Sequence, residues 1–306
     1  MQVSTPFKLE EEKDKKVRVY ATQEKLVAIC VVAPFAGVRV TPKLSVTARF
    51  SYPDEFVLEE FIEKIHEAYP KKENRPPLHI LIHSPGGSVS SSFMAARVLR
   101  SNFDRIVGFI PHIAASGATV MALSCNEIVM GDISRLTGID PYYEMDDEVV
   151  YPLSIVRAFD TLESILGTKS LEEISYPYRH LVQSISAQEY DEAAHTLAMV
   201  EGYARELMSK AGYKGGEIRK VINGILYDIN SHEEVITLDR AKAMGIKAKH
   251  FREDESTAKC WKVMKNWLRN YLLTPSPVHI IRYCIPEPKR DEELKKTKGH
   301  KEGVGS

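Results

Sequence analysis

Two consecutive strand–turn–helix units between Leu78 and Pro141 constrain the fold of this chain more than any other feature. The run LHILIH at 78–83 has the length and residue mix of a strand buried on both faces, and IVGFI at 106–110 repeats that pattern. A helical pattern follows each strand, beginning near Ser88 and near Ser116. Strands that alternate with helices predict right-handed crossovers and a parallel sheet.

Small residues form the turn of each unit, as SPGGS at 84–88 and as AASG at 114–117. A glycine pair after a buried strand lets the backbone approach a ligand, and a serine that opens a helix lies where unpaired N–H groups gather. Adjacent parallel strands present their C-terminal ends at one edge, so we expect the two turns to lie side by side. Each turn alone is ambiguous, because Ser-Gly is also a common helix cap and Pro-Gly-Gly a common turn.

Further elements surround these units in the first half of the chain. Residues 17–32 are rich in β-branched side chains and predict one or two strands, VRVYA and LVAICVV. A strand at 44–50 is possible, although the pattern does not fix its place. Apolar side chains at helical spacing predict an amphipathic helix over Asp54–Tyr69, and Glu127–Met130 reads as another strand.

Helical periodicity dominates after Val150. The predicted helices are Leu153–Leu166, Ala187–Ala211, Glu217–Leu226 and Thr237–Met244, with Gly245 as the stop of the last one. We expect four parts: a flexible arm at 1–16, one α/β domain at 17–250, an extension at 251–286 and a disordered Lys/Glu-rich tail at 287–306. The extension predicts a helix and an apolar strand, and we expect it to contact another copy or a partner.

Charge and cysteine spacing exclude several classes of function. The net charge of -1 argues against a nucleic-acid-binding face. The four cysteines, Cys30, Cys125, Cys260 and Cys284, lie far apart, so we expect neither a disulfide framework nor a metal site. No cofactor is expected.

The N-terminal residues are polar and carry no apolar core of signal-peptide length. The longest apolar run near the start, at 26–37, contains Pro34 and is too short to cross a bilayer. We therefore expect a cytoplasmic protein without an integral membrane segment.

The two turns suit acyl-transfer chemistry if they converge. A serine hydroxyl is a weak nucleophile, so this chemistry needs a base for its proton and donors for the oxyanion that develops. Ser116 can supply the nucleophile, and the N–H groups of Gly117 and Gly87 can form the oxyanion hole.

Four motifs, in order, resemble a known family: SPGGSV, AASGA, EIVM and SRLTGIDP. They are similar to those of the serine dehydrogenase proteinase family, a relative of signal peptide peptidase A in the Clp protease/crotonase superfamily. The resemblance is close over Leu78–Pro141 and continues loosely to Ile246 through SHEEVITLDRAKAMGI.

This resemblance implies an α/β fold of repeated ββα units, with a mostly parallel sheet and a helical C-terminal half. It also implies that Ser116 is the nucleophile and that Gly87, with Gly86, lends an oxyanion donor. The implied partners are a peptide or protein substrate and further copies of the chain, in trimers or larger assemblies.

The base is the open part of this interpretation. A Clp-type enzyme keeps a histidine shortly before the proline of the fourth motif, where this chain has Ile139 and Asp140. Signal peptide peptidase A instead uses a lysine further along the chain, which burial must hold neutral. Lys169 is the candidate for that role, 53 residues after Ser116 (169 − 116) and flanked by apolar side chains.

Histidines offer a rival base. His112 lies four residues before Ser116, and His232 falls in the later segment that resembles the family. Asp140 can orient such a histidine or only shape the turn before the proline. His83, directly before the first turn, lines the cleft or packs at the end of its strand.

Three functions fit these residues. The first is a serine hydrolase, specifically a peptidase that uses a dyad of Ser116 and Lys169. The second is a crotonase-like enzyme whose two backbone N–H groups hold a thioester oxyanion without a covalent serine. The third is an inactive scaffold of the same fold.

Overall fold

The computed structural model describes residues 7–24, 27–32, 38–41, 44–46, 49–145, 148–167, 169–170, 172–184, 186–273 and 280–288. The predicted tail at 287–306 therefore lies almost wholly outside the described residues, as do the first six residues of the predicted arm.

A six-stranded sheet forms the centre of the molecule, in the order β11-β7-β5-β4-β1-β12. All neighbouring strands are parallel except β12, which pairs antiparallel with β1 at one edge. The strands are β1 (Val27–Val32), β4 (Leu78–His83), β5 (Ile106–Ile110), β7 (Glu127–Met130), β11 (Ala248–His250) and β12 (Ile280–Cys284). The mostly parallel sheet predicted from the sequence is confirmed.

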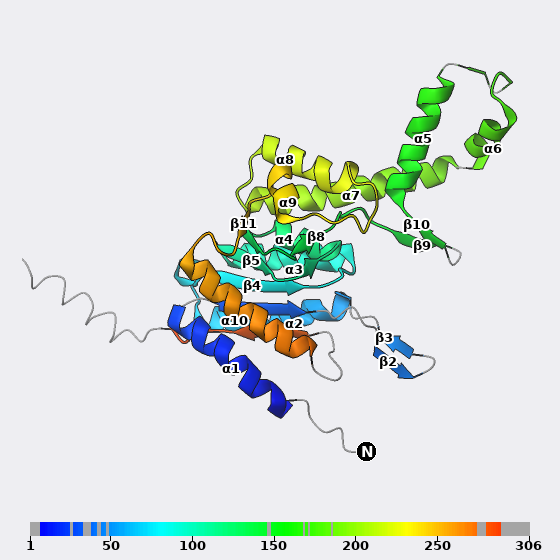
Figure 1. Cartoon of the computed structure of the whole chain (residues 1–306). Helices are drawn as coiled ribbons and strands as arrows, with labels where there is room; N and C mark the ends of the chain where they lie inside the picture. The colour runs from blue at the N-terminus through cyan, green and yellow to red at the C-terminus, as the bar shows by residue number, and fades with distance from the viewer. Residues whose placement is uncertain are drawn as a thin grey trace, which may run out of the picture.

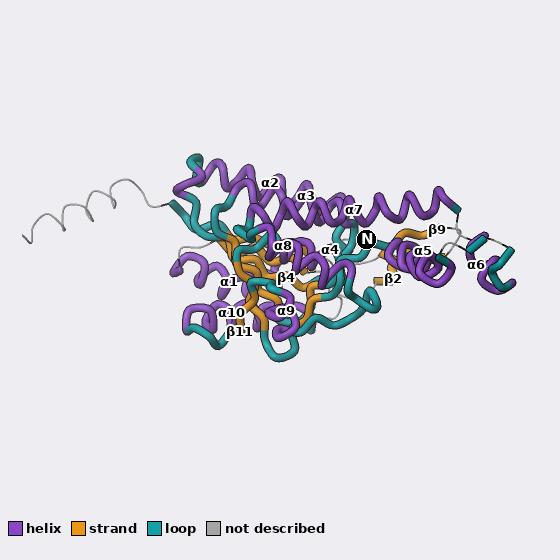
Figure 2. The backbone as a smooth tube through the Cα atoms, turned by 90° about the horizontal axis from the view of Figure 1, so that it is seen from above, coloured by secondary structure: helices purple, strands orange, loops and turns teal. Residues whose placement is uncertain are grey.

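Helices cover both faces of the sheet, which explains its continuous apolar strands. In β4, Ile80 and Ile82 belong to the core on one face, whereas Leu81 belongs to the core on the other. The first face carries α2 (Tyr52–Ala68), α3 (Val89–Asn102), α4 (Gly117–Leu123) and α7 (Ala187–Lys210), and the second carries α1 (Phe7–Glu24) and α10 (Glu255–Leu272). Figures 1 and 2 show these two layers on opposite sides of the strands.

The strand predicted at 17–21 is wrong, because these residues belong to α1. Val17 and Ala21, four residues apart, are buried in the same core as α10, whereas Val19 between them is 46% exposed. Residues four apart share a helix face, so packing against α10 selects the helix over the β-branched preference of the short run. The helix also includes residues 7–16 of the predicted arm.

The segment after residue 250 packs on its own chain. Its predicted helix is α10, and its predicted strand is β12, which extends the central sheet. Trp261 and Trp267 of α10 are buried against the sheet. The structure thus gives this segment an intramolecular place, and a contact with another copy or a partner stays a prediction.

An arm projects from the body, formed by α5 (Pro152–Leu166), α6 (Tyr176–Ser184) and the adjoining end of α7 (Figure 1). The hairpin of β9 (Tyr143–Met145) and β10 (Glu148–Val150) lies at its base. The remaining elements are β2 (Val38–Thr41), β3 (Leu44–Val46), a short 3-10 helix (Lys72–Asn74), β6 (Ile113–Ala114), β8 (Arg135–Leu136), α8 (Gly215–Ile222), a π-helical turn (Asn223–Tyr227) and α9 (Leu238–Met244). Within the described residues, no helix is both long and apolar enough to cross a membrane.

Candidate active site

The two turns predicted to converge do lie side by side. The N–H of Ala115 donates to the carbonyl of Ser84 at 3.0 Å, and the N–H of Ser84 donates to the carbonyl of Ile113 at 3.1 Å. These bonds continue the parallel order of β4 and β5 beyond the ends of both strands. They hold the glycine turn directly against the turn that carries Ser116.

Ser116 has a strained backbone at the start of α4. Its φ of 49° makes it the one non-glycine residue with a positive φ in the described ranges, and its ψ is -119°. Such a conformation costs of the order of 1–3 kcal/mol and persists only where the surroundings enforce it. Here the backbone N–H of Ser116 donates to Thr137 Oγ1 at 2.9 Å, and Thr119 Oγ1 donates to the carbonyl of Thr137 at 3.1 Å.

Glycine is required where the two turns touch. A Cβ on Gly86, whose φ is 103°, would lie 2.8 Å from the carbonyl oxygen of Ala115 and 2.9 Å from the Cβ of Ser116. A Cβ on Gly87 would lie 2.0 Å from the carbonyl oxygen of Phe50. Only a chain without side chains here brings the first turn within reach of Ser116.

The N–H groups of the three predicted oxyanion residues differ in what they bind. Gly86 donates to Ser84 Oγ at 3.0 Å and is therefore already engaged. The bridge of Phe50 to Gly87 uses the carbonyl of Gly86 and the N–H of Ser88, which leaves the Gly87 N–H out of it. Gly117 is the first residue of α4, where a backbone N–H has no partner within the helix.

His232 and Asp140 form a hydrogen-bonded pair in the same pocket. His232 Nδ1 lies 3.0 Å from Asp140 Oδ1, and the side chains are 17% and 4% exposed, respectively. The backbone enforces this pairing, because Leu136 and Ile236 exchange N–H···O bonds of 3.0 and 2.9 Å and so fix the chain around residue 232 against β8. The carboxylate selects the tautomer with the proton on Nδ1, which leaves Nε2 as an acceptor.

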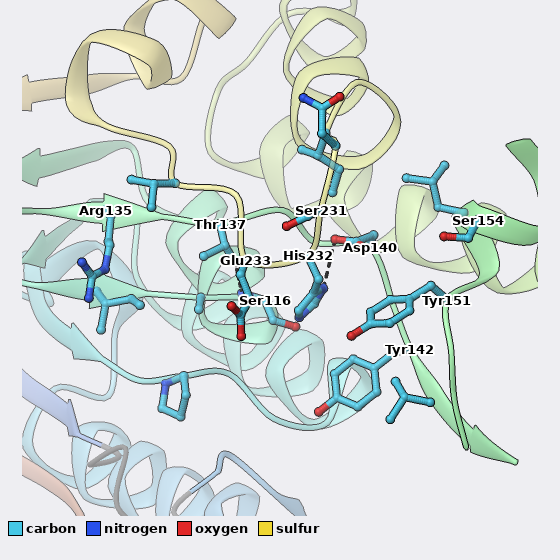
Figure 3. Close-up of a pocket in the computed structure, with 18 of the residues that line it drawn as sticks. Ser116, Arg135, Thr137, Asp140, Tyr142, Tyr151, Ser154, Ser231, His232 and Glu233 are labelled. Carbon is cyan, nitrogen blue, oxygen red and sulfur yellow. Dashed lines mark hydrogen bonds and ion pairs between the residues drawn. The ribbon is translucent and has the colours of Figure 1, made fainter. Parts of the chain in front are cut away.

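A pocket of about 1010 Å³ contains these groups. Figure 3 shows Ser116 with its side chain directed toward the ring of His232, and Asp140 on the other side of that ring. The rings of Tyr142 and Tyr151 pack against His232, with centroids 5.4 and 6.0 Å away. The lining residues include Pro85, Gly87, Ser116, Thr137, Asp140, Tyr142, Tyr151 and His232.

The other predicted bases lie elsewhere. Lys169 is exposed in the arm after α5 and does not line this pocket. His112 and His83 stack on each other with ring centroids 5.4 Å apart, and neither lines the pocket. Burial lowers the pKa of both, to about 4 for His83, and the charge of Arg135 contributes in each case.

Four residues of this pocket were not identified from the sequence. Thr137 accepts the Ser116 N–H, Arg135 lines the pocket, and Tyr142 and Tyr151 hold His232. Thr137 and Arg135 belong to the SRLTGIDP motif, so the motif itself carried that signal. The tyrosines follow it with no spacing that distinguishes them from core residues. No cluster of three or more metal-ligating side chains occurs among the residues whose placement is described.

Comparison with known proteins identifies relatives over most of the chain. The model of the ClpP-like SDH-type serine proteinases matches residues 54–295. Two uncharacterized proteins of Methanocaldococcus jannaschii, MJ0137 and MJ1495, are 27% and 24% identical over 194 and 193 residues, which is 63% of this chain in each case. The matched region spans 60% and 59% of those relatives.

Similar solved structures are more distant. A mutant of the 1510-N membrane-bound stomatin-specific protease shares 12% identity at a TM-score of 0.41, with 70% of this chain and 79% of that chain covered. A Pseudomonas malonate decarboxylase hetero-tetramer with malonate shares 9% at a TM-score of 0.34, with 90% and 84% covered. Such distant likenesses carry no argument about chemistry. The family match covers well over half of the sequence, and the chain therefore belongs to the ClpP-like SDH-type serine proteinases.

Proposed function

We propose that this chain is a serine peptidase in which Ser116 is the nucleophile, His232 the general base and Asp140 the residue that orients the base. The observation that carries the proposal is the His232–Asp140 pair at 3.0 Å, in the pocket that Ser116 also lines. Membership of a serine proteinase family supports the peptidase activity.

The proposed reaction has two halves. Ser116 Oγ attacks the peptide carbonyl carbon while its proton passes to His232 Nε2, and the protonated ring is stabilised by the Asp140 carboxylate. The carbonyl oxygen becomes an oxyanion, for which the N–H groups of Gly87 and Gly117 are the proposed donors. His232 then gives its proton to the leaving amine as the C–N bond breaks, and a water activated by the same base hydrolyses the acyl-enzyme.

This proposal replaces the predicted dyad of Ser116 and Lys169. A lysine base must be neutral, which requires burial. Lys169 is exposed and lies outside the pocket, whereas His232 is partly buried and already paired. The proposal thus puts a histidine in the role of the Clp-type base, supplied by the later segment SHEEVITLDRAKAMGI rather than by the residues just before Pro141.

A fluorophosphonate probe tests the nucleophile and the base together. We expect a covalent adduct on Ser116, identified by peptide mass spectrometry, and none in Ser116→Ala. Ser154→Ala, which changes another serine of the pocket, should still be labelled on Ser116. Asp140→Asn should lower the rate of peptide hydrolysis by about 10⁴-fold, since the wrong histidine tautomer is then favoured.

Lys169→Ala is the control for the base. It should leave the labelling rate within about twofold of the wild type, whereas His232→Gln should abolish it. Labelling lost with Lys169→Ala and kept with His232→Gln would restore the lysine dyad. Absence of labelling in the wild type, with saturable binding of an acyl-coenzyme A, would favour the crotonase-like alternative.

Assembly and location stay proposals of the same kind. Exposed aromatic side chains on the arm, such as Phe159 at 41% and Tyr176 at 80%, support the proposal of a homo-oligomer. Light scattering during size-exclusion chromatography gives the number of copies, and a monomer mass would refute the assembly.

A further inference from the structure

The pocket is lined by more arginines than carboxylates. Its lining includes Arg49, Arg135 and Arg157, against the two carboxylates Asp140 and Glu233. Asp140 is hydrogen-bonded to His232, and Glu233 is exposed. The pocket therefore has an excess of positive charge that its own carboxylates do not neutralise.

Two of the three arginines have partners in the protein. Arg49 donates to the hydroxyl of Tyr142, and Arg157 donates to the carbonyl of Tyr227. Arg135 is partly buried, and no ion pair joins its guanidinium to a carboxylate within the described part of the chain. Its backbone N–H donates to the carbonyl of His112 at 2.9 Å. This bond fixes β8 but does not neutralise the charge of the Arg135 guanidinium.

Among the described residues, Arg135 forms no ion pair with Glu233, the exposed carboxylate that lines the same pocket. The lining of the pocket also includes the apolar residues Pro85, Ile113 and Val235. His83 and His112 lie close enough for the charge of Arg135 to lower their pKa further, below the effect of burial. Both rings are then neutral at pH 7 and supply no negative charge to the guanidinium. A partly buried cation in such a place is best satisfied by an anion that arrives with the ligand.

The backbone places Arg135 at a definite distance from the reacting atoms. Arg135 and Thr137 are two residues apart in an extended segment, so their side chains share a face and their Cα atoms are about 7 Å apart. Thr137 Oγ1 accepts the N–H of Ser116. Figure 3 shows Arg135 at one end of the pocket, Tyr142 and Tyr151 at the other, and Ser116 between them.

We propose that Arg135 is a specificity residue that binds a carboxylate of the peptide substrate, one or two residues from the scissile bond. This inference rests on the proposed peptidase function, since it names the substrate of that same site. An extended peptide advances about 3.3 Å per residue, so the separation of about 7 Å between the Cα atoms of Arg135 and Thr137 corresponds to about two residues of substrate. The carboxylate can belong to an aspartate or glutamate side chain or to the C-terminus of the peptide.

Binding to full-length Ser116→Ala tests the inference without catalysis. The probes are fluorescent hexapeptides of alanine and leucine with blocked ends, carrying one glutamate at each position in turn, and their glutamine counterparts. A further peptide without glutamate has a free C-terminal carboxylate, which separates the two sources of the charge. Fluorescence anisotropy gives the dissociation constants.

We expect at least one glutamate peptide, or the free C-terminus, to bind about 10- to 100-fold more tightly than its neutral counterpart. The preference should vanish when Arg135→Gln is added, and Arg135→Glu should reverse it in favour of the glutamine peptides. Arg97→Gln, which removes an exposed arginine outside the pocket, should keep it. Raising the salt concentration should weaken the preference.

Equal affinity for charged and neutral peptides at every position would overturn the inference, and so would a preference that survives Arg135→Gln. Failure of the whole set to bind would also overturn it. None of these outcomes depends on Ser116 as a nucleophile, because Ser116→Ala carries no hydroxyl. Labelling of wild-type Ser116 by the fluorophosphonate decides that question separately.

Discussion

Two buried histidines make the stability of this fold depend on pH. Burial lowers the pKa of His79 and of His83 to about 4, from an ordinary value near 6.5. The unfolded chain therefore takes up protons as the pH falls below about 6.5, while the folded chain keeps both rings neutral until about pH 4. The contribution of the two rings to the free energy of unfolding is complete above the unfolded pKa. It falls progressively as the pH drops toward the folded pKa.

The size of this loss follows from the two pKa values. A shift of about 2.5 units corresponds to about 3 kcal/mol for each histidine once the pH is below both values. At pH 5 the linkage relation gives about 2 kcal/mol for each ring. We expect urea unfolding at pH 7 and pH 5 to differ by about 4 kcal/mol from these two groups, added to whatever other groups contribute.

His79→Gln isolates one ring. His79 Nδ1 lies 3.3 Å from Cys260 Sγ, and its ring is 5.3 Å from that of Phe109, in the core beneath α10. Between pH 7 and pH 5, the free energy of unfolding of the variant should fall by about 2 kcal/mol less than that of the wild type. This difference should hold whatever the stability of the variant at pH 7. Val129→Ala, which removes buried volume from the same core without a titrating group, should keep the wild-type difference. An unchanged pH difference in His79→Gln would refute the assignment.

Three further predictions concern packing and access. Phe61→Ala should lower the free energy of unfolding in urea by about 3–5 kcal/mol, because this ring is fully buried and stacks on Phe103, whereas Phe56→Ala, at a position 58% exposed, should change it by no more than about 0.5 kcal/mol. Burial raises the pKa of Cys125 and Cys260 to about 12. At pH 8, iodoacetamide should therefore modify neither thiol in the folded protein and both in concentrated urea, as measured by mass spectrometry. Modification at equal rates in both states would contradict this. Gly202→Ala should stabilise α7 by about 0.5–1 kcal/mol in thermal or urea melts, since an added Cβ meets nothing within 4 Å, while Gly87→Ala should be destabilising because its Cβ would collide with Phe50.

Local patterns in the sequence predicted the central sheet because burial on both faces leaves a clear signature. The runs at 78–83 and 106–110 are β4 and β5 with the predicted bounds, and Glu127–Met130 is β7. The same argument placed the turns of Gly87 and Ser116 at one edge. These conclusions needed only the order of the elements and the handedness of their connections.

The proposed base could not be predicted from the sequence in the same way. His232 and Asp140 are 92 residues apart, and their contact depends on the bridge between Leu136 and Ile236. No sequence periodicity indicates such a bridge, so His232, His112 and Lys169 stayed alternatives. The position of Lys169 also depends on the tertiary structure, because this residue follows α5, which projects away from the body (Figure 1).

Hydrogen bonds around Ser116 hold the two turns together and decide which N–H groups are left for the proposed oxyanion hole. Thr137 takes the N–H of Ser116, so that group is not free for an oxyanion, and Gly86 is bound to Ser84. The donors left for the proposed hole, at Gly87 and Gly117, come from different turns and are useful only while those turns stay in contact. The bonds between Ser84 and Ala115 therefore do more than extend the sheet. They fix the spacing of the two donors before substrate binds, which is the condition for electrostatic stabilisation of an oxyanion.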